Sequence, residues 1–227
     1  MLAQPYLEIV CGLVGLAAGS LIVYSAPRLV AYRLPEPIPF PSAWVLLPVV
    51  GILREQWRVR SSLLVEAVTA LVLVLLAVRY GSSIQLVITG AYSVVFVAMG
   101  YIDIDHRLVL NRMSYPAIAL AFPISLVWPN HGWRNALLGA ATAGLIFVVL
   151  QVIGQGRLGT GDTKLAILIG AVHGFPDVLN SLIMGMLFGG IAGILLMVVL
   201  RRGRKEYFAY APYLAAGAIV SFLVSLS

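Results

Sequence analysis

Three aspartates stand where long apolar segments end, and they are the residues whose type and position could do chemistry. Asp103 and Asp105 close one apolar segment, and Asp162 lies between two others. A carboxylate at the edge of a membrane span is costly to keep there and usually has a function. Two carboxylates held close together cannot both ionise easily, so one can act as an acid while the other acts as a base. Such a pair activates a water molecule directly, without a metal ion.

The surroundings of Asp162 suit a site of this kind. Gly159 and Gly161 lack a Cβ atom, so the backbone beside Asp162 can come close to another group. The sequence offers no competing machinery, because the single cysteine cannot build a thiolate zinc site and the three histidines are scattered. We therefore predict no metal site.

Two further roles for these aspartates are compatible with the residues alone. Asp103 or Asp105 could simply cap a helix or pair with Arg107. A proton-coupled membrane transporter could use the same acids.

The composition places these carboxylates in a membrane protein. Of 227 residues, 61% are apolar and only 11% are charged, whereas a soluble domain has about 25% charged residues. A span needs about 20 mostly apolar residues. The sequence predicts an all-α, polytopic integral membrane helix bundle with about eight transmembrane helices, forming a single membrane-embedded domain over residues 1–227. The predicted segments are residues 7–26, 62–78, 84–102, 113–128, 136–153, 163–173, 178–200 and 210–227.

Two of these segments have further features. The sixth is too short to cross a bilayer of about 30 Å by itself, so we expect residues 159–162 to be irregular backbone lining a wet pocket, or the bilayer to thin locally. In the seventh, Gly185, Gly189 and Gly193 recur at four-residue spacing, which is typical of close helix packing.

The basic residues predict the orientation. With the N-terminus outside, 13 of the 15 Lys and Arg residues fall in inside loops, and only Arg79 and Arg134 fall outside. This orientation puts Asp103, Asp105 and Asp162 on the same, cytoplasmic, face. The longest inside loop, residues 27–61, contains an apolar piece at 44–53 that is too short to span and is expected at the interface or against the bundle.

Several motifs resemble those of the prepilin peptidases, or type IV leader peptidases, which are Gly-x-Gly-Asp intramembrane aspartyl proteases. Residues 159–165, Gly-Thr-Gly-Asp-Thr-Lys-Leu, resemble the Gly-x-Gly-Asp-x-Lys-Leu signature. Residues 102–111 resemble the Ile-Asp-x-Asp-x-x-x-x-Pro-Asp/Asn segment, with Leu110 where Pro is usual. Residues 15–20, 64–69 and 209–214 are similar to further family segments, in the same order.

The resemblance implies an endopeptidase at the cytoplasmic side of the bacterial plasma (inner) membrane. Its catalytic pair would be Asp103 and Asp162, with Asp105 as the alternate. Gly159, Gly161, Lys164 and Glu66 would support them, although Glu66 could equally be a buried structural contact. The substrate would be a pilin-like precursor, with a basic leader in the cytoplasm and an apolar helix in the bilayer, cut just after a Gly. No nucleic acid is expected as a partner.

One departure from the family pattern bears on cofactors. Many members carry two Cys-x-x-Cys pairs, which form a zinc site, in the first cytoplasmic loop, whereas residues 27–61 contain no cysteine. We therefore expect no zinc and no cofactor requirement for cleavage. The family's second activity, N-methylation of the new N-terminus with S-adenosylmethionine, is left in doubt. The sequence identifies neither the pilin substrate nor the oligomeric state.

Overall fold

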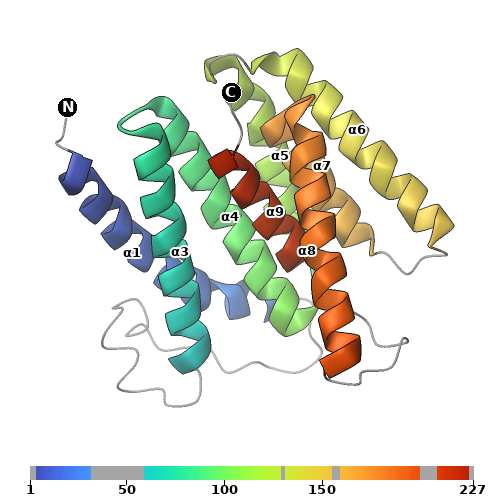
Figure 1. Ribbon diagram of the computed structural model, residues 1–227, viewed down its shortest axis with the longest axis horizontal. Coiled ribbons are helices and arrows are strands. Elements are labelled where there is room, and N and C mark those ends of the chain that lie inside the picture. The colour runs from blue at the N-terminus through green and yellow to red at the C-terminus, as the bar shows by residue number, and fades with distance from the viewer. Residues whose placement is uncertain (1–3, 32–58, 129–130, 155–158, 200–208, 225–227) are drawn as a thin grey trace. The chain divides into compact units, whose positions relative to one another are not determined.

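The computed structural model describes residues 4–31, 59–128, 131–154, 159–199 and 209–224. Within these ranges every regular element is a helix, which confirms the predicted all-α class (Figure 1). The helices are α1 (Gln4–Val30), α3 (Val59–Tyr80), α4 (Ile84–His106), α5 (Asn111–Val127), α6 (Gly132–Ile153), α7 (Thr160–His173), α8 (Asp177–Val199) and α9 (Ala211–Val224).

Five of these helices are long and apolar enough to cross a membrane, namely α1, α3, α4, α6 and α8. The other three described helices have 17, 14 and 14 residues. The chain is therefore a multi-pass membrane protein. Within the described ranges each predicted segment overlaps a helix, although several helices extend beyond the predicted ends.

The predicted loop at 27–61 is wrong at both ends. Helix α1 continues through Pro27 to Val30, and α3 begins at Val59. The last turn of α1 is held by Arg28, whose Nη1 donates to the Tyr24 carbonyl at 2.9 Å and whose guanidinium carbon lies 3.6 Å from the centre of the Tyr24 ring. A proline inside a membrane helix is tolerated where side chains satisfy the nearby backbone. The predicted interfacial piece at 44–53 lies outside the described residues.

The chain divides into two compact units, Met1–Ala98 and Met99–Ser227, with the boundary inside α4. In the first unit, α1 packs closely on α3 through glycines. A Cβ atom at Gly19 would lie 2.5 Å from the Cα of Glu66, and one at Gly15 would collide with the backbone of Ala70. Small residues four apart allow two membrane helices to approach in this way. The single domain that we expect from the sequence stays a prediction.

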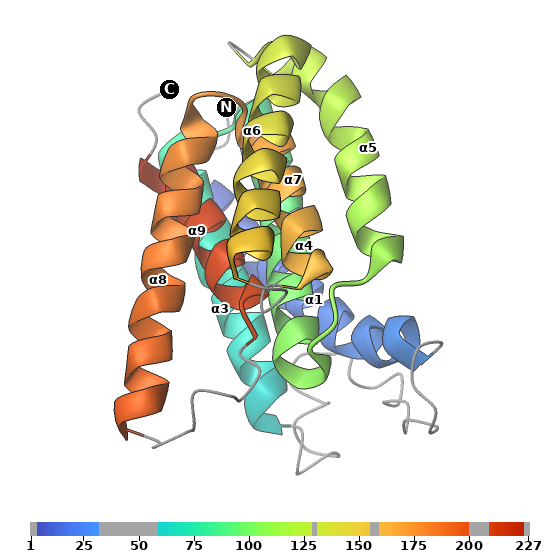
Figure 2. The ribbon, with the colours of Figure 1, turned by 90° about the vertical axis from the view of Figure 1, so that its right-hand side faces the viewer.

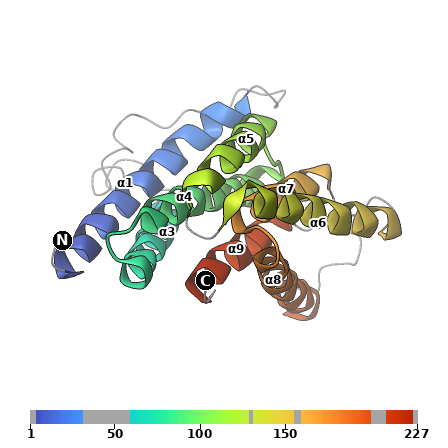
Figure 3. The same ribbon diagram turned by 90° about the horizontal axis from the view of Figure 1, so that it is seen from above.

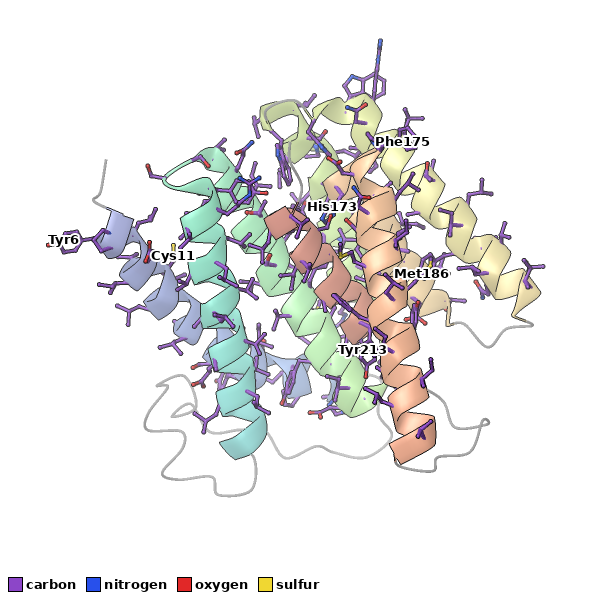
Figure 4. All side chains as sticks on the ribbon, in the orientation of Figure 1. Tyr6, Cys11, His173, Phe175, Met186 and Tyr213 are labelled. Carbon is purple, nitrogen blue, oxygen red and sulfur yellow. The ribbon has the colours of Figure 1, made fainter. Side chains whose placement is uncertain are left out.

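In the second unit, α7 is the central helix. It contacts α5, α6, α8 and α9, and Figure 3 shows it beside α6. Most of its residues are buried, including Leu165, Leu168 and Ile169 at 0% exposure. Its C-terminal end is joined to α9 by His173, whose ring nitrogens lie 3.1 Å from the carbonyl oxygens of Ile169 and Ala218 (Figure 4). This histidine serves packing rather than metal binding.

The start of α7 corrects one prediction. Residues 160–162 are not irregular backbone, because α7 already begins at Thr160. Gly159 precedes the helix in an extended conformation, with φ −71° and ψ 146°. The side chain of Asp162 accepts the Gly159 N–H, which stabilises this first turn as an N-terminal cap does. Only Gly159 is therefore non-helical among the predicted irregular residues 159–162.

Glycines also set the spacing of α8 and α9, which lie side by side in Figure 1. A Cβ at Gly185 would lie 3.0 Å from the Cα of Leu214, and one at Gly189 would lie 2.5 Å from Cε2 of Tyr210. The predicted packing role is confirmed for these two residues. It is wrong for Gly193, whose Cβ would meet nothing within 4 Å among the described residues.

Helices α6 and α7 approach each other closely at Gly139 and Gly170. We expect Gly170→Ala to lower the free energy of unfolding by about 1–3 kcal/mol, because its Cβ would lie 2.6 Å from the carbonyl carbon of Gly139 and force the helices apart. Gly193→Ala is the matched control and should be neutral or stabilising, since alanine is the better helix former. Unfolding in mixed detergent micelles measures both, and equal stability of the two variants would contradict this packing.

The second glycine test concerns the start of α7, where Gly161 faces the linker after α4. A Cβ on Gly161 would lie 2.8 Å from Cβ of Val109, whereas one on Gly159 would have its nearest neighbour at 3.4 Å, in ordinary contact. Gly161→Ala should therefore lose about 1–3 kcal/mol of stability, and Gly159→Ala should lose little. The same unfolding measurement applies. A Gly161→Ala variant as stable as Gly159→Ala would show that the linker does not lie against α7.

Candidate active site

The candidate site lies within the second unit, where the end of α4 and the starts of α7 and α9 lie at the same end of the bundle (Figure 2). Gly100 of α4 is close to α9, since a Cβ there would lie 3.3 Å from the Cα of Pro212. This contact places the last turn of α4, which carries Asp103, against the first turn of α9.

Asp103 is buried, with 6% of its surface exposed. Its Oδ2 atom accepts a hydrogen bond of 3.2 Å from the backbone N–H of Ala211. Ala211 is the first residue of α9, so its N–H has no partner inside its own helix. A helix start is also where a negative charge is favoured. The burial of Asp103 is thus compensated by the first turn of a helix more than 100 residues later in the chain.

Asp162 is half-buried in the first turn of α7. Its Oδ2 atom accepts the backbone N–H of Gly159 at 3.2 Å. Burial, together with the charge of Asp103, raises the pKa of Asp162 to about 6. The two carboxylates lie on segments that meet, since Asp103 accepts from the start of α9 and α7 packs on α9. The structure therefore brings together Asp103 and Asp162.

Asp105 has different surroundings from Asp103. It is exposed at the end of α4, whereas Asp103, half a helical turn earlier, is buried. The two side chains lie two residues apart and so face different sides of the helix. Because Asp105 is exposed at the end of α4, its position suits a solvated or helix-capping residue better than that of Asp103 or Asp162 does.

Lys164 links the two motifs. Its Nζ atom donates to Oδ1 of Asn111 at 2.7 Å and lies 5.1 Å from the centre of the Tyr115 ring. A charged hydrogen bond with a cation–π contact fixes α7 to the first turn of α5. Lys164 therefore holds the segment after Asp103 in register with the segment that carries Asp162.

Glu66 belongs to the first unit. It is buried, with 4% exposure, and its Oε1 atom accepts the Ser20 hydroxyl at 2.9 Å. This contact joins α1 to α3 and corresponds to the structural one of the two predicted alternatives. A role for Glu66 in the reaction stays a prediction.

Two residues of the site, Tyr210 and Ala211, were not predicted from the sequence. Burial and the charge of Asp162 raise the pKa of Tyr210, so this phenol lies near that carboxylate. Ala211 contributes a backbone N–H, which no side-chain pattern reveals. Both residues lie in the segment at 209–214 that is similar to a family motif, and this was the signal in the sequence that could have identified them.

Among the described residues there is no group of three or more His, Cys, Asp or Glu side chains that could hold a metal ion. Within the described site, the chemistry available is that of two neighbouring carboxylates. Each has one oxygen held by a backbone N–H and further lone pairs that can bind water. This arrangement can take a proton from water and give one to a carbonyl oxygen.

Comparisons with known proteins identify a family that the chain resembles. The sequence model of the type IV leader peptidase family matches residues 90–194, which include all three aspartates. The prepilin leader peptidase/N-methyltransferase of Bacillus subtilis is 27% identical over 186 residues, covering 78% of this chain and 75% of that protein. Proteins of the same name from Xanthomonas campestris and Myxococcus xanthus are each 30% identical, over 165 and 148 residues.

The latter matches cover 70% and 61% of this chain, and 58% and 43% of those two proteins. No solved structure matches the chain. The comparisons do not support the alternative of a proton-coupled transporter. Residues 90–194 resemble the type IV leader peptidase family, which confirms the family resemblance predicted from the motifs.

Proposed function

We propose that this protein is a prepilin leader peptidase, an intramembrane aspartyl endopeptidase whose catalytic pair is Asp103 and Asp162. The observation that carries the proposal is that two carboxylates, buried Asp103 and half-buried Asp162, lie at one end of the second unit, each held by a backbone N–H at a helix start. A carboxyl group with a pKa of about 6 is well placed for acid–base work near neutral pH. The name shared by the relatives supports the same conclusion.

The pair carries out hydrolysis by sharing one proton. One carboxylate takes a proton from water as the oxygen attacks the scissile carbonyl carbon, and the other carboxylic acid gives its proton to the carbonyl oxygen. In the second step the carboxyl group that acted as base returns its proton to the leaving nitrogen. The carboxyl group that acted as acid takes a proton back from a hydroxyl of the tetrahedral intermediate. The C–N bond breaks, and both groups recover their starting states.

The substrates we propose are pilin-like precursors, since the relatives are named for prepilin cleavage. The apolar helix of the precursor would lie in the bilayer beside the bundle. Its basic leader would meet a site containing two acids, and such charge complementarity attracts the substrate and orients it. Cleavage would follow a Gly at the end of the leader.

Cleavage by this pair needs no cofactor, and we expect no zinc. Residues 27–61 contain no cysteine, so they lack the ligands of the family's thiolate zinc site. The relatives' name includes N-methyltransferase. Methylation by this chain would require S-adenosylmethionine, and it stays doubtful because the loop lacks the usual cysteines.

For location, we propose the bacterial plasma membrane with the N-terminus outside and the site on the cytoplasmic side. The arrangement of the second unit supports one part of this topology, since Asp103, Asp162 and Ala211 lie at the same end of it. The distribution of Lys and Arg then selects the cytoplasm for that end.

Catalysis is tested by removing each charge in turn. Asp103→Asn and Asp162→Asn should each lower the rate of precursor cleavage by about a hundred- to ten-thousand-fold, because neither residue can perform both proton transfers alone. The double variant should be little worse than either single one, since the pair acts as a unit. The measurement is cleavage of a pilin precursor in membranes with matched enzyme levels, and the product's N-terminus is read by mass spectrometry.

The matched control is Asp105→Asn, the same chemical change at an exposed position two residues away. It should keep most of the wild-type rate, and a chelator added to the wild type should change nothing. Near wild-type cleavage by Asp162→Asn would refute the aspartyl mechanism. An inactive Asp105→Asn beside an active Asp103→Asn would leave the mechanism standing and overturn the choice of residue.

Topology is tested with single cysteines in a Cys11→Ser background. Both Arg112 and Arg134 are exposed, so a cysteine at either position is accessible to a reagent on its own side. A membrane-impermeant maleimide should label Arg134→Cys in intact cells, but Arg112→Cys only after permeabilisation. Labelling of Arg112→Cys from outside would reverse the orientation.

A further inference from the structure

The start of α9 lies against α8 through Tyr210, the residue directly before that helix. A Cβ atom at Gly189 of α8 would lie 2.5 Å from Cε2 of the Tyr210 ring and 3.2 Å from both Cδ2 and Cζ. Gly189 is buried, so the ring occupies the place that a side chain on α8 would otherwise fill. The approach requires glycine on α8, because a Cβ atom practically never lies within 3.0 Å of such a carbon.

The backbone of Tyr210 fixes the first turn of α9. Its carbonyl oxygen accepts the N–H groups of Tyr213 at 3.2 Å and Leu214 at 3.3 Å, as the residue before a helix does. The next residue, Ala211, has the N–H that donates to Oδ2 of Asp103 at 3.2 Å. A peptide unit is planar, so this N–H is held in one rigid plane with the Cα atom of Tyr210.

These contacts form a continuous path from α8 to the buried carboxylate at the end of α4. Gly189 sets how closely the Tyr210 ring can lie against α8. The Cα atom that bears this ring shares a peptide plane with the N–H that holds Asp103. A methyl group at position 189 would push the ring away from α8 and move the start of α9 with it. The hydrogen bond to Asp103 would then be lengthened or misaligned.

We propose that Gly189 is a positioning residue for the catalytic pair, because the room it leaves for the Tyr210 ring sets the place of the N–H that holds Asp103. This inference rests on the proposed peptidase function, in which Asp103 takes part in the reaction. Gly189 acts on that carboxylate through Tyr210 and Ala211. The role belongs to this glycine in particular, since a Cβ atom at the next residue, Gly190, would meet nothing within 4 Å among the described residues.

The first test compares Gly189→Ala with Gly190→Ala, the same change at the next residue. Both replace a helical glycine by a better helix former, but only the first meets the Tyr210 ring. Gly189→Ala should lower kcat for precursor cleavage by about ten- to a hundredfold, since a small displacement of a catalytic group has an effect of that size. Its KM should change little, because binding of the precursor is not affected. Gly190→Ala should keep the wild-type kcat. Both are measured on the purified full chain.

An exchange of side-chain size separates contact with the ring from a general effect on α8. Tyr210→Leu removes Cε2 and Cζ, two of the atoms that a Cβ at Gly189 would meet. In the Tyr210→Leu background, Gly189→Ala should therefore cause little further loss of kcat, whatever Tyr210→Leu costs by itself. Tyr210→Phe keeps both atoms. In that background Gly189→Ala should lower kcat by the same factor as in the wild type.

The N–H of Ala211 provides a readout that does not depend on cleavage. If Gly189→Ala weakens the bond to Asp103, hydrogen exchange at Ala211 should become about three- to tenfold faster, which corresponds to the loss of one hydrogen bond. Asp103→Ala removes the acceptor and gives the exchange rate for complete loss. Gly190→Ala should leave the exchange rate unchanged. Exchange is followed at this amide by NMR or by mass spectrometry of fragments.

The possible outcomes distinguish this inference from the proposed function. If the wild type cleaves no precursor, the function fails, and the exchange at Ala211 still shows whether the contact holds. If the wild type cleaves but Gly189→Ala equals Gly190→Ala in kcat and in exchange, only the inference is overturned, because the ring then turns aside without moving Ala211. A loss of kcat that is as large in the Tyr210→Leu background would also overturn it, since the effect would then come from α8 alone.

Discussion

Burying a carboxylate in a membrane protein requires a group that replaces water around its charge, and this requirement organises the second unit. Asp103 is almost fully buried at the C-terminal end of α4, where its own helix dipole disfavours a negative charge. The Ala211 N–H at the start of α9 offsets this disadvantage. Asp162 obtains the same kind of support locally, from Gly159 before α7. The end of α4 and the starts of α7 and α9 must therefore meet at one point.

The helices of the second unit can pack this closely because glycines, which have no side chain, lie at their contacts. Helix α7 contacts four other helices, and its approach to α6 has space only for glycine at positions 139 and 170. Gly185 serves α8 in the same way where that helix crosses α9. At the site itself, Gly161 allows the first turn of α7 to lie against Val109 of the linker. The glycine beside the aspartate is thus a packing residue, and its effect on chemistry is to set the distance of α7 from the end of α4.

The electrostatics of the pair are uneven, although both members are aspartates held by one backbone N–H. Asp103 is buried and held by the start of α9, whereas Asp162 is only half-buried and held by the residue that precedes its own helix. Two chemically identical side chains thereby obtain different proton affinities from their neighbours. Acid–base catalysis by a carboxylate pair depends on this kind of difference.

The sequence alone determined the all-helical membrane class, the approximate helix positions and the family resemblance, because hydropathy over some 20 residues and short motifs are local properties. It also identified Asp103 and Asp162 as candidates, since charges at span edges stand out from apolar surroundings. The sequence misplaced the ends of the 27–61 loop, because the helices on either side continue beyond their apolar runs. It also assigned Gly193 a packing role, because a local pattern does not show which face of a helix meets a neighbour. Only the tertiary structure decided that Asp103 is buried and Asp105 exposed, and that Ala211, through a backbone atom, is the partner of Asp103. These features depend on contacts between segments more than 100 residues apart, which no local pattern encodes.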